Sequence, residues 1–236
     1  MKIIVLSLAK YREKDVIVNA ISEDSLVTFK ATGVLSPNHK NASINNVLTI
    51  ADAAIKDIPT GKKILKDCSI IYSPLFTGND LTFLTCINTI AEATNKMLPD
   101  NEKHLAFSYL ELALTRLQEK ENPLLITFAY IIKLMKFAGL NFDINHCVKC
   151  GTKENIVGFS LSSGGFVCRD CFNSEEEIDF RGTTMLTFRK LSGSQDFKFD
   201  FEVDEKELKH IFLRIIYFLR DYTGVYLDSP RLIINY

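Results

Sequence analysis

The chain has 236 residues, of which 47% are hydrophobic and 24% are charged, and its formal net charge at pH 7 is −1. This is ordinary globular composition, and it excludes wholesale disorder. Because the overall charge is nearly zero, a nucleic-acid or membrane partner would have to be bound by a local patch.

Two segments indicate the compartment. The longest apolar stretch, residues 123–139, is interrupted by Lys133 and Lys136, so we do not expect a membrane span. The N-terminal segment MKIIVLSLAKYREKD has a hydrophobic run too short for a signal peptide. We therefore expect a cytoplasmic protein, and in that reducing compartment its six cysteines should not form a disulfide framework.

The first third of the chain predicts strands. Segments rich in β-branched residues span 2–8, 15–21 and 25–31, and weaker candidates span 45–55 and 63–72. Polar turns separate these segments. Five short strands favour a small closed barrel, because closure removes exposed sheet edges.

From about residue 80 the apolar residues recur at helical spacing. Helices are expected over 81–98, 102–120, 123–139 and 204–224. The third has Asn122 and Pro123 at its start, and the last begins with Asp204 in a capping-box spacing and ends at Gly224. Because helices flank the cysteine-rich segment, that segment is inserted into, or appended to, a helical domain.

We therefore predict an α+β protein made of three parts. A barrel takes residues 1–78, and a cysteine module takes residues 147–172. The helical domain takes residues 79–146 and 173–236.

Four cysteines form one pattern: Cys147-x2-Cys150, seventeen residues, then Cys168-x2-Cys171. Two such pairs at this spacing predict a tetrahedral zinc site. With four protein ligands the metal has no open position, so its role is structural. An iron–sulfur cluster on the same ligands, a redox pair and His146 as a substitute ligand remain alternatives.

No catalytic motif accompanies this site. The sequence lacks a P-loop, a dinucleotide-binding glycine motif, a nucleophile elbow and a zinc-protease motif. We therefore predict that the protein is not an enzyme, although a mechanism based on carboxylates alone stays open.

The barrel segment offers a modest cluster of cations for nucleic acid: Lys10, Arg12, Lys14, Lys30 and Lys40. Loops at these places on a small barrel hold single strands. Few aromatic residues accompany them, namely Tyr11, Phe29, Tyr72 and Phe76, so we expect phosphate-led binding with weak base preference. The alternative is a solvated face that Glu13, Asp15, Glu23 and Asp24 neutralise.

Three segments then occur in order along most of the chain: YREKDVIVNAI, AGLNFDINHCVKCG with GFSLSSGGFVCRDC, and FLRDYTGVYLDSPRLI. Together they resemble the RecO family of bacterial recombination mediators, and the middle segment is the most specific. The chain departs from the family in ATGVLSPNHKNAS, which is usually more basic and here holds only Lys40 and His39 as basic residues.

The resemblance implies an N-terminal OB-fold, a helical domain and a four-cysteine zinc ribbon in a non-catalytic protein. Such proteins bind single- and double-stranded DNA at the nucleoid, anneal complementary strands and, with RecR, help load RecA onto strands covered by single-strand-binding protein. The alternative is a zinc-stabilised protein-interaction module with little direct DNA binding.

The resemblance also implies a groove in the helical domain for the tail of the single-strand-binding protein. Lys133 and Lys136 would form its basic rim beside Phe128, Ile132 and Phe137. Arg116 is assigned to the same groove. Alternatively, the helix over 123–139 is the central core helix and its lysines only extend to solvent.

Overall fold

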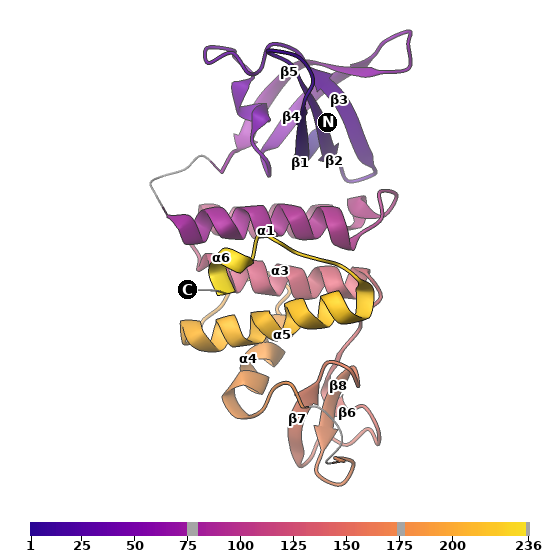
Figure 1. Ribbon diagram of the computed structural model, residues 1–236, viewed down its shortest axis with the longest axis vertical. Coiled ribbons are helices and arrows are strands. Elements are labelled where there is room, and N and C mark those ends of the chain that lie inside the picture. The colour runs from indigo at the N-terminus through magenta and orange to yellow at the C-terminus, as the bar shows by residue number, and fades with distance from the viewer. Residues whose placement is uncertain (75–79, 174–177, 235–236) are drawn as a thin grey trace.

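The computed structural model describes residues 1–74, 80–173 and 178–234. A barrel and a three-stranded sheet lie at opposite ends of the molecule, with the helices between them (Figure 1). Among the described helices, none is long and apolar enough to cross a membrane. Phe76 and the expected boundary at residue 78 lie outside the described residues.

Five strands close the barrel in the described part of the chain, in the order β1-β2-β3-β5-β4. Neighbouring strands pair antiparallel, except that β3 meets β5 in parallel where Lys30 pairs with Ile64. The strands are β1 (Lys2–Lys10), β2 (Val16–Ile21), β3 (Leu26–Ala31), β4 (Ile50–Asp57) and β5 (Lys63–Tyr72). The barrel has its own apolar interior, which includes Ile3, Val5, Val18 and Phe29.

The predicted barrel is confirmed, but its fourth strand begins at Ile50 rather than residue 45. A short 3₁₀ helix, η1 (Ala42–Asn45), precedes it. Polar side chains satisfy the backbone there, because Asn46 and the Thr49 hydroxyl both donate to the carbonyl of Ser43. Such local bonds compete with strand pairing and delay the start of the strand.

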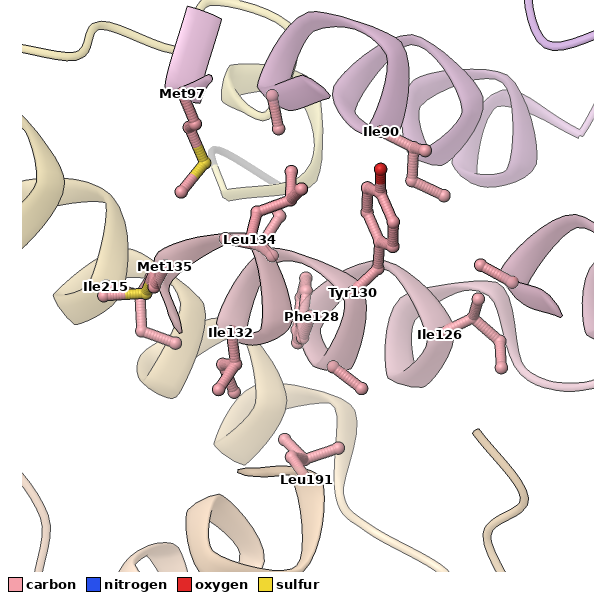
Figure 2. Packing of buried hydrophobic residues seen from close by; sticks show 14 of the residues in the cluster. Ile90, Met97, Ile126, Phe128, Tyr130, Ile132, Leu134, Met135, Leu191 and Ile215 are labelled. Atoms are coloured by element: carbon pink, nitrogen blue, oxygen red, sulfur yellow. The ribbon is translucent and has the colours of Figure 1, made fainter. Parts of the chain in front are cut away.

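The helical part is built around one buried helix, α3 (Pro123–Phe137), as Figure 2 shows. Asn122 caps it by accepting hydrogen bonds from the N–H groups of Leu124 and Leu125. Every residue from 124 to 135 is buried. The other helical elements are α1 (Leu81–Met97), η2 (Lys103–Ala106), α2 (Phe107–Gln118), α4 (Gly182–Gly193), α5 (Glu205–Thr223) and α6 (Arg231–Ile234).

The predicted helices are confirmed with one division: the segment 102–120 splits into η2 and α2. The structure also contains α4, which the sequence patterns did not indicate. In Figure 2, Tyr130 points from α3 toward Ile90 of α1, and Ile132 points the opposite way, toward Leu191 of α4. The Tyr130 hydroxyl lies 2.8 Å from that of Thr94, so this buried phenol has a partner.

The barrel packs directly onto the helices. Ile4, Leu6 and Ile50 of the barrel belong to the same buried cluster as residues of α1 and α3. Asn95 of α1 donates a hydrogen bond of 3.0 Å to the carbonyl of Leu6. The apolar core is therefore continuous from the base of the barrel into the helices.

The sheet at the far end consists of β6 (Asp143–Cys147), β7 (Ile156–Ser160) and β8 (Gly165–Cys168), in the order β6-β8-β7. Strands β7 and β8 form the hairpin expected from Gly164-Gly165, and Gly164 has a φ of +80°. On the side facing the helices, Phe159 contacts the rings of Phe166, Phe180 and Phe188. This phenylalanine cluster attaches the sheet to the helical core.

Candidate metal centre and nucleic-acid interface

The four cysteines of the predicted motif converge at the tip of the small sheet. Cys147 ends β6 and Cys168 ends β8, and each begins a tight turn that carries the second cysteine of its pair. All four sulfur atoms lie within 4.8 Å of one another, and those of Cys150 and Cys168 are 3.7 Å apart. A tetrahedral zinc with bonds of about 2.3 Å separates its sulfurs by about 3.8 Å, so this cluster can hold a metal ion.

Backbone hydrogen bonds fix these turns. The N–H of Gly151 donates to the carbonyl of Cys147, and Gly151 has a φ of +76°, which favours glycine. In the second turn the N–H of Phe172 donates to the carbonyl of Cys168. His146 instead lies near Asp143, with 3.4 Å between its Nδ1 and the carboxylate, and does not belong to the sulfur cluster.

The sulfur environment favours a bound cation. Burial opposes ionisation of Cys147, but N–H groups of Cys168, Cys150 and Lys149 outweigh it and lower the pKa of this thiol to about 6. Hydrogen bonds with Cys150 and Cys168 raise the pKa of Cys171 to about 12. The pKa of Cys147 is thus lowered while those of Cys150 and Cys171 are raised, and a metal ion bound among these thiols would take them as thiolates.

At the other end of the molecule, Lys10 ends β1, and Arg12 and Lys14 lie in the loop between β1 and β2. All three are exposed. None of them makes an ion pair with the residues that the structure describes. The N–H of Leu35 donates to the carbonyl of Lys14, so the connection after β3 lies against this loop. This end of the barrel therefore presents three exposed cations, with the exposed Glu13 between two of them.

Lys30 lies next to this loop but is already paired. Its Nζ is 2.8 Å from the carboxylate of Asp15, which also accepts from the N–H of Gly33. The bond to Lys30, followed by the one to Gly33, lowers the pKa of Asp15. Asp15 is thus the one predicted neutralising acid that pairs with a cation of this cluster in the described structure.

Lys40 is directed elsewhere: its Nζ lies 2.8 Å from Asp67 on β5. The β4–β5 hairpin adds cations that the sequence argument missed, namely Lys56, Lys62 and Lys66, which are exposed and have no ion pair in the described chain. Lys56 and Lys30 pair with the same residue, Ile64, on either side of β5. The connection between strands 4 and 5 is a common binding loop of such barrels. Its position in the sequence could therefore have identified Lys56, Lys62 and Lys66 as candidate DNA contacts.

The three residues assigned to a partner groove meet at the turn after α4. Arg116 donates to the carbonyl of Asp196 and pairs with Glu119, and Lys133 reaches Gln195 at 3.4 Å. Lys136 is exposed. Burial, and then repulsion by Lys136, lowers the pKa of Lys133.

A cavity of about 250 Å³ lies at this place. Its lining includes Lys133, Lys136 and the apolar side chains of Ile132, Leu140, Phe142 and Ile144. The expectation that Phe128 lies beside the groove is wrong. Phe128 is fully buried and stacks on Phe212, with 4.0 Å between ring centroids. Its position follows from the central place of α3, which has neighbours on several sides.

The closed barrel, the helical core and the four-cysteine sheet define a modular α+β protein built on an OB-type barrel. A family model described as "Recombination protein O C terminal" matches residues 78–231. The chain therefore belongs to the RecO family, which confirms the resemblance seen in the sequence.

Curated relatives extend this similarity to the barrel. The chain is 26% identical to DNA repair protein RecO of Bacillus subtilis (strain 168), over 97% of this chain and 91% of that protein. It is 25% identical to DNA repair protein RecO of Streptococcus pyogenes serotype M49, over 98% and 93% respectively. A shorter match to DNA repair protein RecO of Thermoanaerobacter sp. (strain X514) reaches 35% identity over 40% of this chain and 39% of the relative.

Proposed function

We propose that this RecO-family protein is a mediator of DNA repair and homologous recombination that acts by binding rather than by covalent catalysis. The observation that carries the proposal is the group of exposed cations on the β1–β2 loop, close to those of the β4–β5 hairpin. Cations on one barrel end attract phosphates and release their counterions, and this contribution is independent of sequence.

The same charges support the annealing of complementary strands, because they reduce the repulsion between two phosphate backbones. The protein would bind single- and double-stranded DNA and, with RecR, help load RecA onto strands covered by single-strand-binding protein. We propose these partners because the chain belongs to the RecO family. With them the protein would act at the nucleoid, in the cytoplasm.

The DNA-binding proposal is tested by replacing Lys10, Arg12 and Lys14 together with alanine. Each phosphate contact contributes about −0.7 to the log–log salt slope on single strands, so the slope should flatten by about two units. Gel shifts over a series of salt concentrations measure this. The control is a Lys153→Ala, Arg169→Ala, Lys198→Ala variant, which removes the same charge from exposed sites outside the barrel. An unchanged salt slope in the variant that lacks Lys10, Arg12 and Lys14 would show that DNA binds outside this part of the barrel.

We further propose that the cluster of Cys147, Cys150, Cys168 and Cys171 holds one structural Zn²⁺. The support is the sulfur geometry: all four sulfur atoms lie within 4.8 Å of one another, as the ligands of one tetrahedral ion would. An ion at this place would hold together two turns that contribute few apolar side chains to the core.

The cavity beside α3 is proposed to bind the acidic, aromatic tail of the single-strand-binding protein. Its apolar lining suits an aromatic side chain, and Lys136 at its rim suits a carboxylate. A Lys133→Glu, Lys136→Glu double variant should lose the tail peptide in a fluorescence anisotropy titration, and Lys136→Glu alone should weaken it without disturbing a buried residue. Wild-type affinity in both variants would place the groove elsewhere.

A second function, a zinc-stabilised interaction module with little DNA contact, has one observation in its favour. Lys30 and Lys40 are both paired with aspartates, so two of the five assigned cations are already neutralised. This function predicts that wild-type protein shows no salt-dependent shift of single-stranded DNA while it still binds the tail peptide.

A further inference from the structure

Tyr11 is the exposed aromatic residue of the described barrel. Its exposed fraction is 47%, whereas Phe29 is 1% exposed and belongs to the barrel interior. Tyr72 is half-buried and packs against the helical core. An exposed tyrosine ring in water carries an unfavourable apolar surface, and here it lies among the cations assigned to DNA.

Two of these cations lie over the ring of Tyr11. The guanidinium carbon of Arg12 and the Nζ of Lys30 are each 5.3 Å from the ring centroid, within the range of a cation–π contact. The two cations differ in how firmly their side chains are held. Lys30 is held by Asp15, while Arg12 is exposed and has no ion pair with any residue that the structure describes.

Asp15 fixes this arrangement through both its backbone and its side chain. Its carbonyl accepts from the N–H groups of Tyr11 and Arg12, at 3.0 and 3.4 Å. Its carboxylate, in a residue only 7% exposed, holds Lys30 and the N–H of Gly33. The loop therefore presents the ring from an ordered position, which lowers the entropic cost of binding a flat ligand to it.

The three strands beside the loop carry a row of hydrogen-bonded polar side chains. Asn19 of β2 donates to the hydroxyl of Ser7 on β1 and accepts from the hydroxyl of Thr28 on β3. Thr28 lies two residues before Lys30 on the same strand. Between this row and the loop, the half-buried Ile17 of β2 pairs with Lys30 on the same face of the sheet.

From these contacts we propose that Tyr11, Arg12 and Lys30 form a subsite for one unpaired nucleobase and its adjoining phosphate. The base stacks on the Tyr11 ring in place of Arg12, and the released guanidinium contacts the phosphate. Lys30 stays in position through Asp15. This inference rests on the proposed DNA binding and adds to it the part of the nucleotide that is recognised.

Such a subsite selects single strands without selecting a sequence. Every base has a flat face, so stacking tolerates all of them. In a duplex each base is covered on both faces by its neighbours, and the ring then has no face to contact. The phosphate cations bind both forms of DNA, whereas Tyr11 contributes only to the single-stranded form.

The test compares two short oligonucleotides of equal length and charge, an oligothymidylate and its abasic analogue, by fluorescence anisotropy. Wild-type protein should bind the thymidylate about 5- to 150-fold more tightly, because stacking is the difference between the two ligands. Tyr11→Leu should remove this preference, and Tyr11→Phe, which keeps the ring, should retain it. Neither variant changes a charge, so the salt slope should stay at the wild-type value.

The outcomes separate this inference from the function on which it rests. Equal affinity of wild-type protein for both oligonucleotides, or a preference that survives in Tyr11→Leu, overturns the stacking subsite and leaves phosphate-led DNA binding in place. If wild-type protein binds neither oligonucleotide, the proposed DNA binding fails and the subsite fails with it. Because Tyr11 is exposed, thermal unfolding of both variants should match the wild type.

Discussion

The two β-structures at the ends of the molecule are stabilised in different ways (Figure 1). The barrel closes around its own apolar interior, with Phe29 and Val18 fully buried inside it. The small sheet packs its large aromatic rings on the side where Phe159 and Phe166 meet the helical core. Its tip is held by the turns that carry the cysteines. The comparison teaches that the barrel is stabilised by a hydrophobic core of its own, whereas the tip of the small sheet is where the proposed metal ion would act.

Removing one sulfur should have the largest effect. In Cys150→Ser we expect zinc content to fall below half an equivalent and residues 147–171 to loosen, while the helices persist. Zinc binding in small structural sites amounts to about 10–16 kcal/mol, which is more than the few apolar contacts of the tip can replace. Elemental analysis and hydrogen exchange measure the two effects.

Cys68→Ser is the matched control, since Cys68 lies on β5 outside the cluster and should leave the zinc content unchanged. Less than half an equivalent of zinc in wild-type protein, purified without chelator, would contradict the assignment. Iron with visible absorption would favour the iron–sulfur alternative.

The next largest effect is expected in the barrel interior. Phe29→Ala removes a fully buried ring, and such truncations cost about 3–5 kcal/mol. Urea unfolding followed by circular dichroism should show this loss, while the zinc content stays at one equivalent. A barrel variant that also released zinc would show that the two ends are not stabilised separately.

A smaller effect should come from the close approach of two strands at Gly165. A β-carbon there would lie 2.5 Å from the carbonyl oxygen of Asp143 and 2.6 Å from a methyl group of Val148. Gly165→Ala should therefore destabilise the sheet by about 1–3 kcal/mol and speed the release of zinc to a chelator. Gly193→Ala is the control, because its β-carbon would meet only Ile144, at an ordinary 3.7 Å. Equal release rates in the two variants would refute the packing argument.

The local patterns of the sequence were sufficient for much of this fold. The cysteine spacing identified the whole sulfur cluster, because each pair sits on one turn and the pattern needs no distant residue. The start of α3 could be predicted from Asn122 and Pro123, whose capping role depends only on the next turn of chain.

Features that depend on distant contacts could not be predicted in the same way. Helix α4 begins after Arg181, whose side chain makes no capping bond, and its threonines favour strands. Contacts with other elements therefore stabilise it, above all the packing of Phe188 and Leu191. The approach of Lys30 to Tyr11 requires the register of β2 with β3. Phe128 appeared available for a groove because a helical pattern does not show which neighbours cover each side.

The apolar core that is continuous between the barrel and the helices has a consequence for how the protein unfolds. Ile4, Leu6 and Ile50 are buried against helical residues. Separating the barrel from the helices would therefore expose their shared apolar surface to water. Heating should therefore melt the barrel and the helices in one cooperative step. A fragment that begins at residue 80 would carry an uncovered face of α1 and should aggregate, so dissecting this protein calls for point substitutions in the intact chain.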